Sequence, residues 1–168
     1  FYPADMDDVY RPDIEVIGDI AQALRAISEQ LDDLPKWDFR HYFAIKKNMI
    51  EDINSNVDDP RFPIHPKRFV YELRESLPRD AFLSLDNGMY KIWVARNYPA
   101  YEQNSVLLDN ALATMGAGLP VGIATKLLNP QNKVVVVAGD GGFMMNLADL
   151  ETAVRLKLDM VVIILNDN

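Results

Sequence analysis

The sequence contains no cysteine, only two histidines and no excess of positive charge, and each shortage removes a class of function. Without cysteine there is no disulfide framework, no reactive thiolate and no zinc–thiolate site. His41 and His65 have no second ligand at metal-binding spacing, so we expect surface or capping roles for both. A net charge of −8 argues against nucleic acid or an anionic membrane as the main partner. No segment resembles a signal peptide or a membrane span, so the cytoplasm is the expected location.

Two short apolar runs near the carboxyl end carry the clearest structural signal. Val134–Ala138 and Met160–Leu165 are rich in β-branched residues, which predicts two buried strands. Between them, the pattern predicts a helix that is capped by Asn146 and runs to about Leu158. Two parallel strands joined by a helix form a right-handed crossover. The sequence therefore predicts an α/β fold built on a parallel sheet.

Each of these runs is followed by an aspartate. Asp140 lies in the glycine-rich turn Gly139–Gly142, and Asp167 follows the second run. If the strands are neighbours, about 4.8 Å apart, both carboxylates lie at the sheet edge where open α/β sheets bind ligands. Bare carboxylates repel each other, whereas Mg²⁺ accepts carboxylate oxygens together with ligand phosphates. Glycines also let the backbone approach a phosphate closely. The prediction is a Mg²⁺–diphosphate site, with an ordinary turn and solvated aspartates as the alternative.

The same residues resemble the diphosphate-binding signature of thiamine diphosphate enzymes, which is GDG, then about 25 to 30 residues, then NN. The second Asn of that pair is replaced here by Asp167, as in members similar to catabolic acetolactate synthases. The resemblance implies that Asp140 and Asp167 bind Mg²⁺ through side-chain oxygens. It also implies a three-layer α/β thiamine diphosphate-binding fold with a parallel sheet, of which this chain carries a part.

A second segment, Leu112–Pro120, resembles the part of acetolactate-synthase-type enzymes that holds the aminopyrimidine ring. The resemblance makes Met115 the apolar wedge that bends the cofactor, and a flexible thioether suits contact with a ring edge. It gives the backbone carbonyl of Ala113 the hydrogen bond from the 4′-amino group. A helix from about Gly118 to Leu128 is expected to follow. Taken alone, Met115 would more often be a core residue, and its spacing from Asp140 favours the cofactor contact.

A third segment follows Ala81–Leu85, which is expected to be the first strand of the sheet. In similar enzymes a G-Q-H or G-S-H triplet stands at this point and contacts the diphosphate, whereas this chain has Gly88, Met89 and Tyr90. A plain strand-ending turn and direct cofactor contact are both open here. Together, the residues assigned to cofactor contact are Gly88, Met89, Tyr90, Ala113, Met115, Gly139, Asp140, Gly141, Gly142 and Asp167. The glutamate that contacts the pyrimidine in this family has no counterpart in the chain, so no catalytic residue is assigned.

The resemblance divides the chain into three parts: the tail of a central α/β domain at 1–31, a helical connector at 32–64, and the truncated diphosphate-binding domain at 65–168. Periodicity predicts a short strand at 13–17 and helices at about 18–31, 37–53 and 66–77.

By resemblance, the whole protein decarboxylates a 2-oxo acid, pyruvate, and joins the remainder to a second 2-oxo acid, as acetolactate synthases do. Thiamine diphosphate and Mg²⁺ are the implied cofactors, and FAD in the central domain is left open. The implied partners are a small-molecule 2-oxo acid and the neighbouring subunit of a homodimer or homotetramer. This chain alone is expected to be inactive.

Three alternatives stay open at this point. The first is another thiamine diphosphate decarboxylase or carboligase, of the glyoxylate carboligase or benzoylformate decarboxylase type. The second is a catalytically incompetent module that serves only in binding or assembly. The third and weakest is a dinucleotide-binding domain, because no G-x-G-x-x-G pattern follows Ala138.

Overall fold

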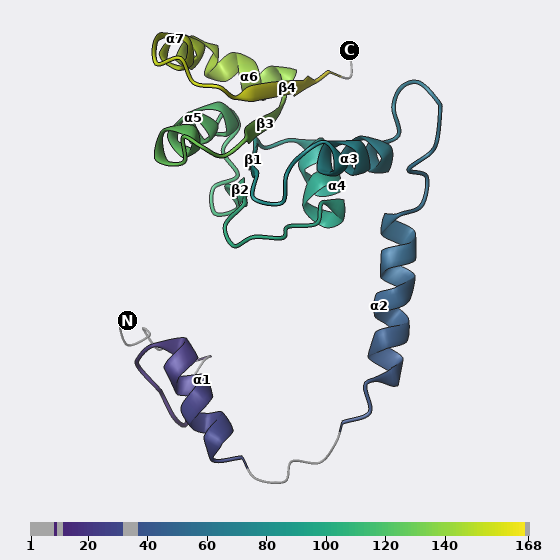
Figure 1. Cartoon of the computed structure of the whole chain (residues 1–168), viewed down its shortest axis with the longest axis vertical. Helices are drawn as coiled ribbons and strands as arrows, with labels where there is room; N and C mark the ends of the chain where they lie inside the picture. Colours follow the sequence, from purple (N-terminus) through teal and green to yellow (C-terminus); the bar gives the residue numbers. More distant parts are fainter. Residues whose placement is uncertain (1–8, 10–11, 32–36, 167–168) are drawn as a thin grey trace. The chain divides into compact units, whose positions relative to one another are not determined.

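The computed structural model describes residue 9 and the ranges 12–31 and 37–166 (Figure 1). The chain divides into two compact units, residues 1–44 and 45–168. The division falls within helix α2, Arg40–Ile53, which lies in the predicted connector. None of the described helices is both long enough and apolar enough to cross a membrane.

The first unit contains helix α1, Ile20–Glu29, close to its predicted bounds. Asp19 caps this helix, since its Oδ1 accepts a hydrogen bond of 2.9 Å from the amide of Gln22. The strand predicted at 13–17 is wrong, because these residues form bends and coil. A strand needs a neighbouring strand for its backbone hydrogen bonds, and the four strands of the described sheet do not include this segment.

The second unit begins its ordered core with helix α3, Pro66–Glu75. Pro66 occupies the first turn, where its missing N–H is not needed. His65 caps the helix because its Nδ1 accepts a hydrogen bond of 3.1 Å from the amide of Lys67. This finding confirms the capping role expected for His65.

A parallel four-stranded sheet follows, in the order β2-β1-β3-β4. The strands are β1 (Phe82–Leu85), β2 (Val106–Leu108), β3 (Val134–Gly139) and β4 (Val161–Leu165). Strands β1, β3 and β4 confirm the predicted strand positions, whereas β2 was not predicted. The burial predicted for Met160–Leu165 is wrong, because β4 is the last strand in the described sheet, and its Val161 is 55% and its Ile164 44% exposed. In the register of the sheet Leu85 pairs with both Leu108 and Val137, and Gly139 pairs with Leu165. The carboxyl ends of the strands therefore meet at one edge.

Helices cover both faces of this sheet (Figure 1). Helices α3 and α4 (Met89–Asn97) pack on one face through a core that includes Val70, Val94 and Val135. On the other face, α5 (Gly118–Leu128) and α7 (Leu150–Arg155) pack through Leu119 and Ala153. Strand β3 is buried on both faces, as parallel central strands usually are. The predicted three-layer α/β fold is confirmed, and α5 has the predicted bounds.

The helix predicted from Asn146 to Leu158 is wrong in its continuity and its end. Two short helices replace it, the 3₁₀-helix η1 (Leu147–Asp149) and α7, and a further helix, α6 (Asp140–Met145), precedes them. Asn146 stands at the N-cap position of η1 but makes no side-chain capping hydrogen bond, and its Nδ2 instead donates a hydrogen bond of 2.7 Å to the carbonyl of Gly116. The Asn146 side chain, which the local pattern assigned to helix capping, thus makes a tertiary hydrogen bond instead.

Candidate diphosphate-binding edge

The carboxyl edge of the sheet collects the ends of three neighbouring strands. Asp86 follows β1, Asp140 follows β3 and Asn166 follows β4. Because Gly139 pairs with Leu165, Asp140 and Asn166 leave the sheet side by side. The predicted adjacency of the two strands is therefore confirmed. Asp167 lies outside the described residues, and its role as a metal ligand stays a prediction.

The glycine turn after β3 leaves its outer surface open. Asp140 is exposed and its Oδ1 accepts a hydrogen bond of 2.8 Å from the amide of Gly141. Among the described residues outside α6 itself, the methyl group of Met115 would be the atom nearest to a Cβ placed on Gly141, at 3.8 Å. The described part of the chain therefore leaves room for a ligand group beside this backbone.

The segment that contains Met115 reaches this turn. Met115 is 46% exposed, and its terminal methyl group lies 3.8 Å from the position that a Cβ on Gly141 would take. Next to Met115, the carbonyl of Gly116 accepts a hydrogen bond of 2.7 Å from the Nδ2 of Asn146, which directly follows α6. Two segments that were predicted separately to serve one cofactor therefore lie together. Ala113, in the same segment, has a φ of 50°, which is unfavourable for a residue with a Cβ. Such strain is commonly found at binding sites, where surrounding contacts hold the backbone in place.

Asp109 provides part of those surrounding contacts. Its carboxylate accepts hydrogen bonds from the amides of Ala111 (3.2 Å), Leu112 (3.3 Å) and Thr114 (3.1 Å). The backbone hydrogen bond from Thr114, followed by that from Leu112, lowers the pKa of the Asp109 carboxyl. The charged form of Asp109 thus organises the loop that leads to Met115.

Asn87 and Lys91, on either side of Gly88 in the sequence, donate hydrogen bonds to the loop that leads to Met115. The Nδ2 of Asn87 donates a hydrogen bond of 2.8 Å to the carbonyl of Thr114. The Nζ of Lys91, in α4, donates a hydrogen bond of 2.7 Å to the carbonyl of Asp109. Sequence reasoning did not identify either residue, because neither belongs to a recognisable motif.

Asp86 is the most buried polar side chain at this edge, with 1% of its surface exposed. Its Oδ2 accepts a hydrogen bond of 3.0 Å from the amide of Gly116, and its Oδ1 accepts one of 3.3 Å from Gly118. Sequence reasoning placed Asp86 only within a loop. The available signal was its position directly after a buried strand and shortly before Gly88.

Of the triplet Gly88, Met89 and Tyr90 at the start of α4, Met89 has an exposed side chain and Tyr90 has a buried hydroxyl. Met89 is 78% exposed, whereas the ring of Tyr90 packs against Gly88 and Gly139. The Tyr90 hydroxyl is buried and has no hydrogen-bond partner in the part of the chain that the structure describes.

The surroundings of this hydroxyl keep it protonated. Burial raises the pKa of Tyr90 to about 12, and the charge of Asp86 adds to the rise. The backbone of Gly139 lowers the pKa of Tyr90 and so offsets part of this rise. It lies beside the hydroxyl, but the two groups do not meet the geometry of a hydrogen bond. The ring of Tyr90 thus packs against Gly139, the last residue of β3. The predicted cofactor contacts of Gly88, Met89 and Tyr90 stay predictions.

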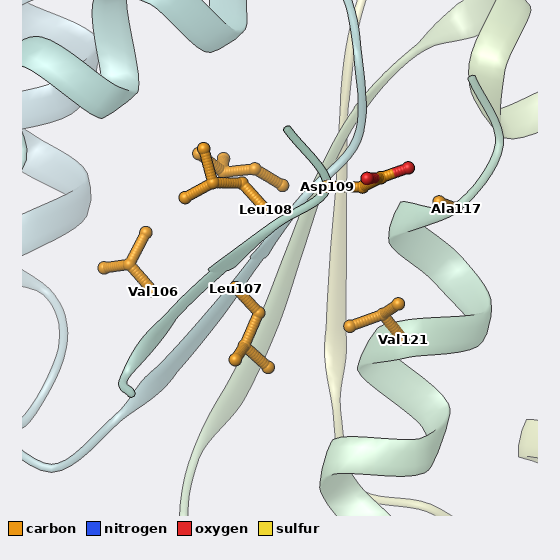
Figure 2. Close-up of a pocket in the computed structure, with 7 residues that line it drawn as sticks. Val106, Leu107, Leu108, Asp109, Ala117 and Val121 are labelled. Atoms are coloured by element: carbon orange, nitrogen blue, oxygen red, sulfur yellow. The ribbon is translucent and has the colours of Figure 1, made fainter. Parts of the chain in front are cut away.

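A cavity of about 340 Å³ lies between β2 and α5 (Figure 2). Its lining is mainly apolar and includes Leu107, Leu108 and Val121, with Asp109 as the charged member. None of the residues predicted to contact the cofactor lines it. We therefore place the candidate site at the exposed turn after β3 and not in this cavity.

The described residues fit a diphosphate cradle better than a complete metal site. Across residues 9, 12–31 and 37–166, no three or more His, Asp or Glu side chains gather where they could hold a metal ion. Of the predicted pair of carboxylates, only Asp140 is described. It is exposed and borders the open backbone of Gly141. This arrangement suits a cation that is shared with ligand phosphates.

Comparison with known proteins identifies the family. Residues 86–168 match the sequence profile of the thiamine pyrophosphate enzyme C-terminal TPP binding domain. The match begins at the buried Asp86. The chain belongs to the thiamine pyrophosphate enzyme family. Thiamine pyrophosphate is another name for thiamine diphosphate, so the resemblance inferred from the sequence is confirmed.

Curated relatives extend the similarity over nearly the whole chain. An acetolactate synthase from Bacillus subtilis (strain 168) is 36% identical over 98% of this chain and 29% of its own length. A catabolic acetolactate synthase from Raoultella terrigena is 34% identical over 99% of this chain and 30% of its own length. A putative thiamine pyrophosphate-containing protein from Bacillus subtilis is also 34% identical. The chain thus spans less than a third of the length of these relatives.

Proposed function

We propose that the protein carrying this chain is a thiamine diphosphate- and Mg²⁺-dependent enzyme of the acetolactate synthase type. It decarboxylates a 2-oxo acid, pyruvate, and joins the remaining carbon unit to a second 2-oxo acid. The observation that carries the proposal is that the two predicted cofactor-binding segments lie together, since the Met115 methyl group is 3.8 Å from the position that a Cβ on Gly141 would take. The names of the relatives, two of them acetolactate synthases, support this choice of reaction.

Thiamine diphosphate, when bound, supplies the electron sink that decarboxylation of a 2-oxo acid requires. The chain's own residues bind and orient it. The backbone of Gly139, Gly141 and Gly142 accommodates the diphosphate, while Asp140 and Asp167 hold the Mg²⁺ that neutralises it. Met115 fixes the relative position of the two rings through apolar contact. The carbonyl of Ala113 accepts the hydrogen bond of the 4′-amino group.

The proposal also includes a second subunit and thus a homodimer or homotetramer. Met115 is half exposed and Asp140 is exposed, so one side of the site is open in the described part of the chain. A neighbouring copy covers that side and supplies the glutamate that contacts the pyrimidine. Excluding water in this way strengthens the electrostatic interactions inside the site.

The experiment that tests the proposal measures CO₂ release by the full-length protein with thiamine diphosphate and Mg²⁺. The substrate panel consists of pyruvate, glyoxylate and benzoylformate, and the products are identified by mass spectrometry. We expect CO₂ from pyruvate together with 2-hydroxy-2-methyl-3-oxobutanoate. Release from glyoxylate or benzoylformate alone would favour the other carboligase and decarboxylase types. No release from any substrate, with cofactor bound, would favour a non-catalytic binding module.

A further inference from the structure

Asp86 is fixed at the centre of the sheet edge, yet it is too buried to touch a ligand. Its own amide donates a hydrogen bond of 2.9 Å to the carbonyl of Val137 in β3, and only 1% of the residue is exposed. A buried carboxylate is costly unless hydrogen bonds satisfy its oxygens. Here both oxygens accept backbone amides of one segment, those of Gly116 and Gly118. Hydrogen bonds to an ionised acceptor are the stronger kind.

Glycines surround this carboxylate on two separate segments. A Cβ on Gly118 would lie 2.7 Å from the Cβ of Asp86, and a Cβ on Gly142 would overlap its Oδ2. Gly142 lies in the first turn of α6, directly after β3, whereas Gly118 begins α5. Asp86 is therefore the common neighbour of the segment that contains Met115 and of the glycine turn.

Gly116 is held from a second side by Asn146. The amide of Gly116 donates to Asp86, while its carbonyl accepts the hydrogen bond of 2.7 Å from the Nδ2 of Asn146. Gly116 has a φ of 86°, a conformation that favours glycine. Both backbone polar groups of the residue that follows Met115 are therefore fixed.

We propose that Asp86 is a positioning residue, which holds Met115 against the glycine turn and thereby sets the affinity for the cofactor. The inference rests on the proposed function, because it requires that Met115 and Gly139–Gly142 bind one cofactor. Asp86 itself touches neither the cofactor nor the metal. Asn146 supports the same arrangement from α6 and η1, the segments that flank it.

The substitution Asp86→Asn tests this role with little change in volume. The asparagine amide group would face the N–H of Gly116 or Gly118, so a donor would meet a donor and at least one hydrogen bond would be lost. Asn146→Ala provides a second, milder variant, because it removes only the bond to the carbonyl of Gly116. The matched control is Asp159→Asn, since the Asp159 side chain is 79% exposed and lies before β4, away from this edge.

Two quantities are measured on the full-length protein: the dissociation constant of thiamine diphosphate with Mg²⁺, by calorimetry, and amide hydrogen exchange without cofactor. Asp86→Asn should weaken binding about ten- to a hundredfold, the factor expected when hydrogen bonds to a buried charged group are lost. Asn146→Ala should weaken binding about tenfold or less, because its amide is a neutral donor. In both variants the amides of residues 113–118 should exchange faster while those of β3 stay protected. Asp159→Asn should change neither quantity.

The two readouts separate failure of this inference from failure of the proposed function. If the unsubstituted protein binds thiamine diphosphate and Asp86→Asn binds it equally well, the positioning role is overturned and the function stands. If Asp86→Asn loses protection in β3 while Asn146→Ala binds normally, Asp86 is a general stability residue and the inference is wrong. If the unsubstituted protein does not bind the cofactor, the proposed function fails and the positioning role fails with it.

Discussion

Helices α1 and α3 have the same length and similar apolar spacing, yet only α3 has a buried face. Both have 10 residues and a side chain that caps the amino end. In α3, Val70 is 1% exposed and Leu73 7%, whereas none of the residues of α1 is buried in the described structure. Helical periodicity thus predicts where a helix forms and which face is apolar. Whether that face is covered depends on a distant surface, which β1 and β3 supply for α3.

The largest difference between the two units is expected when a charged residue replaces one valine in each of them. Val136 in β3 is 0% exposed and Val16 in the first unit is 67% exposed. Val136→Asp should remove the amide protection of β3, a loss of more than about 4 kcal/mol, because the carboxylate is buried without a partner. Val16→Asp should change the protection of its own unit by less than about 0.5 kcal/mol. Amide hydrogen exchange measures both, and similar losses would refute the contrast.

An added methyl group gives a smaller and more local comparison. A Cβ on Gly122 would overlap Val136, whereas a Cβ on Gly18 would have no atom of the described residues within 4 Å. Gly122→Ala should destabilise the packing of α5 on the sheet by about 1–3 kcal/mol, the usual cost of overpacking. Gly18→Ala should have no packing cost. Exchange of the β3 amides is the measurement, and an unchanged rate in Gly122→Ala would contradict the close approach of α5 to β3.

Capping should matter more to a helix without a covered face. Asp19→Ala removes the hydrogen bond to the amide of Gln22 and should destabilise α1 by about 1 kcal/mol. Because no packing compensates within the described residues, this loss should lower the helical population of α1 itself. Carbon chemical shifts of residues 20–29 report that population, while shifts of α3 serve as the internal control. An unchanged helical population would mean that contacts other than the cap hold α1.

The smallest expected effect is a pH dependence of the loop at the candidate site. The pKa of Asp109 is lowered in the folded protein, so its contribution is present above the ordinary pKa of an aspartate, about 3.9. That contribution is lost as the pH falls through the lowered pKa. Protection of the amides of Ala111, Leu112 and Thr114 should therefore decline only in this acidic range. Asp109→Asn should abolish the pH dependence, and a decline that persists in this variant would assign it to another group.

Much of the fold was predictable because its signals are local. The runs that became β1, β3 and β4 are apolar and end at polar or glycine residues, and α5 starts at a glycine and ends before Asn129. Strand β2 was missed because its three residues are short for a strand and depend on pairing with β1. The segment at 13–17 has a strand-like sequence but is not one of the four strands of the described sheet. Pairing is a nonlocal property that a run of residues does not encode by itself.

The arrangement of residues at the sheet edge was predictable in part, whereas their cofactor contacts stay predictions. Gly139–Gly142 and Met115 were identified from motifs, and the Met115 methyl group lies 3.8 Å from the position that a Cβ on Gly141 would take. Asp86 was missed because an aspartate after a strand looks the same whether it is solvated or buried. Its partners are backbone amides 30 and 32 residues further along the chain, and backbone groups leave no sequence signal. Asn146 was misassigned for a related reason, since its tertiary bond replaced the expected cap.

The most direct test of the central proposal is calorimetric titration of the full-length protein with thiamine diphosphate, with and without Mg²⁺, beside Asp140→Asn. We expect binding that requires Mg²⁺ and that the substitution abolishes, because Asp140 is the described carboxylate at the open glycine turn. Asp159→Asn again provides the matched control and should bind normally. Binding that is equally tight without Mg²⁺, or unchanged in Asp140→Asn, would contradict the assignment of this edge as the metal–diphosphate site.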